Sequence, residues 1–157
     1  MNAPAAMPRF QPQDPAFAAR CRASFGRQAA MRLIGARLTI VEPGCTEIEL
    51  DYRDDLTQQK GYLHGGIIGM IADSACGYAA YTLMPSSSSL VTVEYKINLM
   101  APAVGEMLIA RGEVIKPGRT LSVTRGEVVA RKGGKLVQIA VMQQTLMMLP
   151  DTPDTPE

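Results

Sequence analysis

One carboxylate, that of Asp73, stands alone in a long apolar part of the sequence. Between Gly61 and Val93 it is the only formally charged side chain. Burying an unpaired carboxylate costs on the order of several kcal/mol unless other groups compensate it, and such a group is a candidate general base or nucleophile. We therefore predict that Asp73 is catalytic. The alternative is a structural charge held by backbone amides or by a cation across a dimer.

Two glycines, Gly65 and Gly66, follow the only histidine of the chain, His64. The residues from Leu63 to Tyr81 are apolar on nearly every side, which is typical of a helix that is buried all round. The first amides of a helix lack internal partners and are electropositive, and small residues let a ligand approach them. We therefore predict that the Gly65 amide polarises a carbonyl group.

These two groups cannot serve the same carbonyl from one helix. Gly65 and Asp73 are eight residues apart, which corresponds to about 12 Å along a helix. Two copies of the helix running antiparallel about a two-fold axis would bring Gly65 of one chain beside Asp73 of the other. The spacing predicts a homodimer with two shared sites.

The rest of the sequence predicts a helix before this stretch and strands on both sides of it. Asp14-Pro15 is typical of a helix start and Gly35 of a helix end, so we predict a helix over Ala16–Ile34 that turns Leu33 inward. By composition, 1–13 is a flexible arm, 14–149 one domain and 150–157 a disordered tail. Alternating residues predict the strands Ala36–Val41, Cys45–Tyr52, Leu90–Leu99, Met107–Ile115, Thr120–Arg131 and Leu136–Met148.

The composition excludes several classes of function. The 157 residues suffice for one domain with a core, and a net charge of +1 does not suggest a nucleic-acid surface. The three cysteines are far apart and form neither a disulfide framework nor a metal motif. The start of the chain lacks a signal-peptide pattern, and Asp73 argues against a membrane span. We expect a cytoplasmic protein that binds neither nucleic acid nor membranes.

The run His64-Gly65-Gly66, with an acidic residue nine positions after the histidine on an uncharged helix, resembles the hot-dog fold acyl-CoA thioesterases of the phenylacetate-degradation (PaaI) type. The resemblance extends from about Phe25 to Met148. It implies an α+β hot-dog fold, in which an antiparallel sheet wraps around a long central helix, with an N-terminal helix. It also implies hydrolysis of an acyl-CoA to a carboxylic acid and CoA, without a metal or other cofactor. The enzyme would be a homodimer or a dimer of dimers with sites at the subunit interface.

The resemblance implies further site residues. In this family a carboxamide six residues before the histidine lies near the thioester and the attacking water; here it is Gln58, or Gln59 if the loop register differs. A hydroxyl on the first strand after the helix helps to position water or the carboxylate, which indicates Thr92. His64 and Gly66 belong to the substrate loop. From its place before the glycines, we expect His64 to be structural and to position this loop by hydrogen bonds; the alternative is a catalytic acid-base role. The alternative for Gln58 is a solvated loop residue without a catalytic part.

The assignment of Thr92 depends on which way its strand faces. Alternation along Leu90–Leu99 predicts one apolar face, with Val91, Val93 and Tyr95, and one polar face, with Thr92. Thr92 would then point the opposite way from Tyr95.

A basic turn from Lys116 to Thr120 is the predicted CoA contact. Phosphates are usually bound by arginine, lysine or turn amides, and the counterpart of this turn in the family lies near the nucleotide. We therefore predict that Lys116, Gly118, Arg119 and Thr120 bind the substrate. The alternative is a solvated basic turn.

Three rival functions remain to be weighed. A hot-dog hydratase is disfavoured because its pair of an acidic residue and a histidine is missing. A plain dimerisation domain does not explain Asp73 in an apolar helix. A non-catalytic acyl-CoA-binding module, which would keep the glycine loop but release no thiol, is the main alternative.

Overall fold

The computed structural model describes residues 10–152, 154 and 155; residues 1–9, most of the predicted arm, lie outside the described residues. Two short helices precede a hairpin, one long helix follows, and four strands end the fold. The elements are α1 (Phe17–Arg27), α2 (Ala29–Ile34), β1 (Arg37–Glu42), β2 (Cys45–Asp51), the 3-10 turn η1 (Asp54–Leu56), α3 (Gly65–Tyr81), β3 (Ser89–Leu99), β4 (Met107–Lys116), β5 (Leu121–Lys132) and β6 (Lys135–Leu149).

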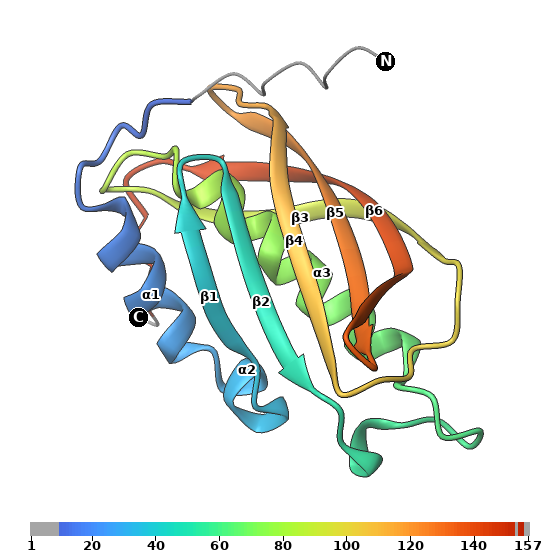
Figure 1. The fold of residues 1–157 in the computed structure, drawn as a ribbon. Coiled ribbons are helices and arrows are strands. Elements are labelled where there is room, and N and C mark those ends of the chain that lie inside the picture. Colours follow the sequence, from blue (N-terminus) through green and yellow to red (C-terminus); the bar gives the residue numbers. More distant parts are fainter. Residues whose placement is uncertain (1–9, 153, 156–157) are drawn as a thin grey trace.

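The six strands form one antiparallel sheet that curves around α3 (Figure 1). Their order is β1-β2-β4-β5-β6-β3, so β3 follows α3 in the chain but occupies an edge of the sheet beside β6. Strands β2 to β6 all contact α3, which explains why this helix is apolar nearly all round. The predicted α+β arrangement, an antiparallel sheet wrapped around a central helix, is confirmed.

The backbone of α3 comes very close to the sheet at β4. A Cβ atom added to Gly112 would lie 2.3 Å from the Ala75 carbonyl carbon and 2.4 Å from its oxygen. On the neighbouring strand, the Thr46 hydroxyl donates to the Ala75 carbonyl oxygen (2.6 Å). A glycine at position 112 is therefore what allows the helix to approach the strands so closely.

The prediction of one helix over Ala16–Ile34 is wrong, because the helix is interrupted at Gln28. Gln28 is extended (φ −67°, ψ 101°) and separates α1 from α2. After the break, α2 buries Met31 and Ile34, which leaves Leu33 78% exposed rather than inward. The predicted stop at Gly35 is confirmed by its left-handed conformation (φ 76°).

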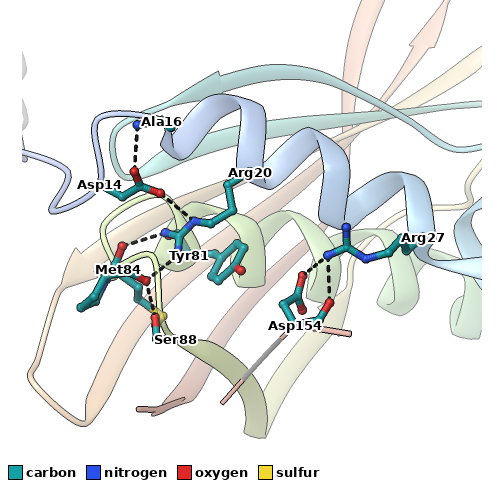
Figure 2. A network of polar contacts seen from close by, with 9 residues as sticks. Asp14, Ala16, Arg20, Arg27, Tyr81, Met84, Ser88 and Asp154 are labelled. Carbon is teal, nitrogen blue, oxygen red and sulfur yellow. Dashed lines mark hydrogen bonds and ion pairs between the residues drawn. The ribbon is translucent and has the colours of Figure 1, made fainter. Parts of the chain in front are cut away.

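Arg20 of α1 joins this helix to the C-terminal end of α3 (Figure 2). Its guanidinium donates to the carbonyl oxygens of Tyr81 (3.1 Å), Met84 (2.7 Å) and Pro85. It also lies 4.2 Å from the centre of the Tyr81 ring and 3.1 Å from a carboxylate oxygen of Asp14. This partly buried cation thus binds carbonyls at the electronegative C-terminal end of α3 and in the turn that follows it.

Replacing Arg20 with alanine should lower the free energy of unfolding by about 2–3 kcal/mol, because hydrogen bonds from a charged group are lost and Asp14 is left buried without its partner. Urea unfolding measures the change. Arg22→Ala is the control, since the exposed Arg22 also donates to backbone carbonyls, those of Leu38 and Thr39. Equal losses in the two variants would contradict a special role for Arg20.

Candidate active site

Asp73 meets two other side chains, one from β3 and one from β6. Its Oδ1 accepts hydrogen bonds from the Thr92 hydroxyl (2.8 Å) and from Nε2 of Gln144 (2.5 Å). The same Nε2 donates to the Thr92 hydroxyl oxygen (2.9 Å). Asp73 is half-buried, and Gln144 is fully buried. Side chains from two strands, β3 directly after α3 and β6 at the end of the fold, therefore converge on one carboxylate oxygen of α3.

The directions of these hydrogen bonds leave the other carboxylate oxygen free. Thr92 accepts from Gln144, so its own proton goes to Oδ1 of Asp73. No hydrogen bond within the described residues involves Oδ2 of Asp73. A carboxylate fixed through one oxygen can use the other as a base or as a nucleophile.

A β-bulge at Val93 brings Thr92 to this site. The pairing of β3 with β6 shifts between Thr92 and Glu94, leaving Val93 as the extra residue. The predicted strict alternation is therefore wrong: Thr92 reaches Asp73 on the helix side, and Tyr95, beyond the bulge, approaches α3 as well. A bulge re-aims the side chains next to it, and this one puts Thr92 on the same side as Tyr95.

Gln144 is the site residue that the sequence analysis missed. It lies on the inner face of β6 between Met142 and Leu146, which are buried like it. Two adjacent glutamines, Gln143 and Gln144, interrupt this strand, and alternation requires one of them to face inward. A glutamine that must face inward from an otherwise apolar strand is the feature of the sequence that could have indicated Gln144.

His64 begins α3 and holds the glycine loop. Its Nδ1 accepts from the Gly66 N–H (2.9 Å), so the ring caps the helix. The backbone N–H of His64 donates to the Leu56 carbonyl oxygen (2.9 Å). Among the described residues, the Gly65 N–H donates to no acceptor. Of the two glycine amides, the one at Gly65 remains available at the electropositive end of the helix.

The other predicted residues lie apart from Asp73 within one chain. Gln58 is in the loop before α3, where its Oε1 accepts from the Lys60 N–H (2.8 Å). The predicted CoA turn lies near the opposite end of α3 (Figure 1), where it borders a small cavity of about 190 Å³. Lys116 and Thr120 are exposed there, and the cavity is lined by Gly118 and Arg119 with residues that follow α3.

A larger cavity of about 510 Å³ adjoins Asp73. Gly77 and Tyr81, which follow Asp73 at four-residue intervals on α3, line this cavity. A buried pair of hydroxyls, those of Ser24 and Tyr78, lines it as well; their oxygens are 2.9 Å apart. Burial raises the pKa of Tyr78 to about 12, so this hydroxyl stays neutral. The remaining lining residues are Arg27, Gln28, Ser74, Ser89, Leu90, Val91, Thr92, Leu149, Asp154 and Thr155.

Part of the predicted disordered tail forms one wall of this cavity. Arg27 of α1 lies 2.7 Å from the Asp154 carboxylate and also donates to the Asp154 carbonyl (2.8 Å) (Figure 2). Asp154 is therefore held against α1, and Thr155 also lines the cavity. The division into arm, domain and tail stays a prediction.

Other kinds of site find little support in the part of the chain that the structure describes. No group of three metal-ligating side chains lies close together in these residues. Their cysteines are free thiols, and burial raises the pKa of Cys76, three residues after Asp73, to about 12. Among the described helices, none is both long and apolar enough to cross a membrane.

Comparison with known proteins assigns the family. Residues 60–137 match the Thioesterase superfamily. A thioesterase family protein from Silicibacter pomeroyi is 46% identical, with 85% of this chain and 98% of that chain covered and a TM-score of 0.84. Human acyl-coenzyme A thioesterase 13 is 29% identical over 109 residues, which cover 68% of this chain and 76% of the relative.

The fold comparison agrees with this assignment. The PaaI protein of the E. coli phenylacetic acid degradation operon has the same fold, with a TM-score of 0.79 at 18% identity, over 87% of this chain and 95% of that chain. The six-stranded sheet around α3 is thus the hot-dog fold that the sequence predicts. The chain belongs to the thioesterase superfamily and is a thioester hydrolase.

Proposed function

We propose that the protein is an acyl-CoA thioesterase that hydrolyses an acyl-CoA to a carboxylic acid and free CoA. The observation that carries the proposal is the carboxylate of Asp73, held through Oδ1 with Oδ2 free beside a cavity of about 510 Å³. The relatives named acyl-coenzyme A thioesterase support this substrate class.

In this mechanism Asp73 drives the attack on the thioester carbonyl. As a base, Oδ2 takes a proton from water while the water oxygen bonds to the carbonyl carbon; the carbon–sulfur bond then breaks, and the thiolate leaves and receives the proton. As a nucleophile, Oδ2 itself bonds to the carbon, and the carbon–sulfur bond breaks to form an anhydride and release the thiolate. Water then hydrolyses the anhydride to the carboxylic acid and the Asp73 carboxylate, and the proton that is released goes to the thiolate. The Gly65 amide stabilises the oxyanion in both cases, and Gln58 orients the water.

We propose that each site is shared between two chains of a homodimer or a dimer of dimers. The separation of Gly65 from Asp73 along α3, about 12 Å, is too long for one carbonyl group. The edge strand β3 supports a dimer, because no other described strand pairs with its outer edge and it exposes Val91, Val93 and Leu99. An exposed apolar edge strand is a surface that proteins normally cover.

Release of free thiol tests the activity. The protein is assayed over a panel of aliphatic and aromatic acyl-CoAs, with CoA release followed continuously and acyl-CoA binding measured in parallel. Thiol release that stops when Asp73 is replaced supports the proposal. Binding without thiol release would instead indicate the non-catalytic acyl-CoA-binding module. The cytoplasmic location stays a prediction.

Replacing Lys116 and Arg119 together with alanine should raise KM more than it lowers kcat. Both side chains are exposed, and their attraction to CoA phosphates is screened by salt, so the increase in KM should be larger at low ionic strength. The matched control replaces Lys132 and Lys135, which flank the β5–β6 turn. An unchanged KM at every ionic strength would show that the Lys116–Thr120 turn does not bind the CoA phosphates.

A further inference from the structure

Gln144 is a fully buried amide in an apolar core. Its exposure is 0%, and its neighbours on the inner face of β6, Met142 and Leu146, are apolar. Burying an amide is unfavourable unless its polar atoms are paired. The side-chain hydrogen bonds of Gln144 within the described residues go to Asp73 and Thr92. The position of this amide is therefore explained by the site rather than by the packing of the strand.

Both protons of the Gln144 amide are used at this site. Nε2 carries two N–H groups; one donates to Oδ1 of Asp73 (2.5 Å) and the other to the hydroxyl oxygen of Thr92 (2.9 Å). Because Thr92 accepts from Gln144, its hydroxyl proton is directed to Asp73. Gln144 thus provides one hydrogen bond to the carboxylate and sets the direction of the other.

The amide oxygen of Gln144 is left without a partner. Oε1 is buried, and no donor within the described residues reaches it. The opposite amide orientation would put this oxygen 2.5 Å from Oδ1 of Asp73, where two acceptors repel each other unless a proton lies between them. A buried acceptor without a partner is unfavourable for folding. The charged carboxylate explains why the amide keeps its nitrogen toward Asp73.

We propose that Gln144 is a positioning residue for the hydrolysis. It acts through Asp73 and Thr92: the two donated hydrogen bonds hold Oδ1 and direct Oδ2 toward the substrate, and they stabilise the charged carboxylate. This role rests on the proposed function. A general base or nucleophile that is displaced by about 1 Å can lose about a hundredfold in rate.

Gln144→Met is the first test, because methionine has nearly the same volume but neither donor. We expect kcat to fall between about tenfold and a hundredfold with little change in KM. The acidic limb of the profile of kcat/KM against pH should move to higher pH, because the carboxylate loses the hydrogen bond that Gln144 donates to it. The melting temperature should not fall in proportion, because the unpaired Oε1 is removed as well.

Gln144→Glu is the second test and keeps the shape of the side chain. It puts a second carboxylate beside Asp73, and two carboxylates at this distance share one proton. The acidic limb should therefore move to still higher pH than in Gln144→Met. Gln143→Met is the matched control: Gln143 is exposed on the other face of β6, so this variant should keep the wild-type profile.

Few other titratable groups can produce such a shift. Burial raises the pKa of Cys76 and of Tyr78 to about 12, and it also raises the pKa of Tyr81, so these groups stay neutral in the acidic range. Asp154, which pairs with Arg27 across the cavity, is the remaining carboxylate in the lining. Asp154→Asn should leave the acidic limb in place; a shift in this variant as large as in Gln144→Met would contradict the proposal.

The outcomes separate the positioning role from the proposed function. Wild-type protein that releases no thiol would overturn both. Active wild-type protein together with a Gln144→Met variant of unchanged kcat and pH profile would overturn the positioning role alone. A loss of activity that only follows a loss of folded protein, with the same pH profile per folded molecule, would show that Gln144 is structural and would likewise overturn it.

Discussion

Replacing Asp73 with asparagine should lower kcat at least about a hundredfold, the contribution of a general base, while the protein remains folded. The asparagine carbonyl oxygen can still accept from Thr92 and Gln144, as Oδ1 does in the native protein. Only the free oxygen is exchanged for an NH₂ group, which is neither a base nor an effective nucleophile. Substrate binding should persist, because a carboxylate beside a thioester adds little attraction to the ground state.

Melting temperature and kcat measured on one preparation decide between the two roles of Asp73. If Asp73 is a structural charge, Asp73→Asn should show first as lost stability, with activity per folded molecule little altered. A folded variant with near-normal kcat would end the mechanism proposed above.

Replacing Gly65 with proline should also lower kcat by about a hundredfold or more, the cost of removing one donor to an oxyanion. Gly65 is the first residue of α3, a position where proline fits a helix and removes only the backbone N–H. Gly65→Ala is the control. A Cβ atom there meets only the end of the Leu99 side chain, at 2.8 Å, and the N–H is kept, so most of the activity should remain. Equal losses in both variants would point to steric damage instead.

Mixing the Gly65→Pro and Asp73→Asn proteins tests whether the sites are shared. In a hybrid dimer one site receives both intact groups and the other receives neither. Random exchange of equal amounts should recover about a quarter of the wild-type activity. If both groups of one chain serve the same site, mixing recovers nothing. Chain exchange is verified by separating tagged from untagged chains.

The elements that repeat a local pattern could be predicted from the sequence. The apolar helix around Asp73 and the alternating strands were found because burial imposes a period on nearby residues. The break at Gln28 could not be found this way, because the apolar residues continue across it. The same continuous pattern predicts that Leu33 points inward. In the structure α2 buries Met31 and Ile34 instead, and Leu33 is exposed.

The residues around Asp73 could be predicted only in part, because only some of them stand out in the local sequence. Asp73 stands out in the sequence because it is isolated among apolar residues. Gln144 is 71 residues further along the chain, and its contact with Asp73 cannot be predicted without knowing how β6 pairs in the sheet. The bulge at Val93 depends on how β3 pairs with β6. The alternation of residues along one strand does not reveal the register of this pairing. Thr92 was named through a resemblance, but its direction required the sheet.

The contact between Gly112 and Ala75 links the position of Asp73 to a residue that lines neither of the two cavities. Ala75 is two positions after Asp73, which puts it on roughly the opposite side of α3. Any side chain at position 112 would have to push the helix away from β4 and, with it, move the carboxylate relative to Thr92 and Gln144. Under the proposed mechanism, the residue at position 112 is therefore restricted by catalysis as well as by stability, and a family member with a larger residue there would need a differently spaced helix.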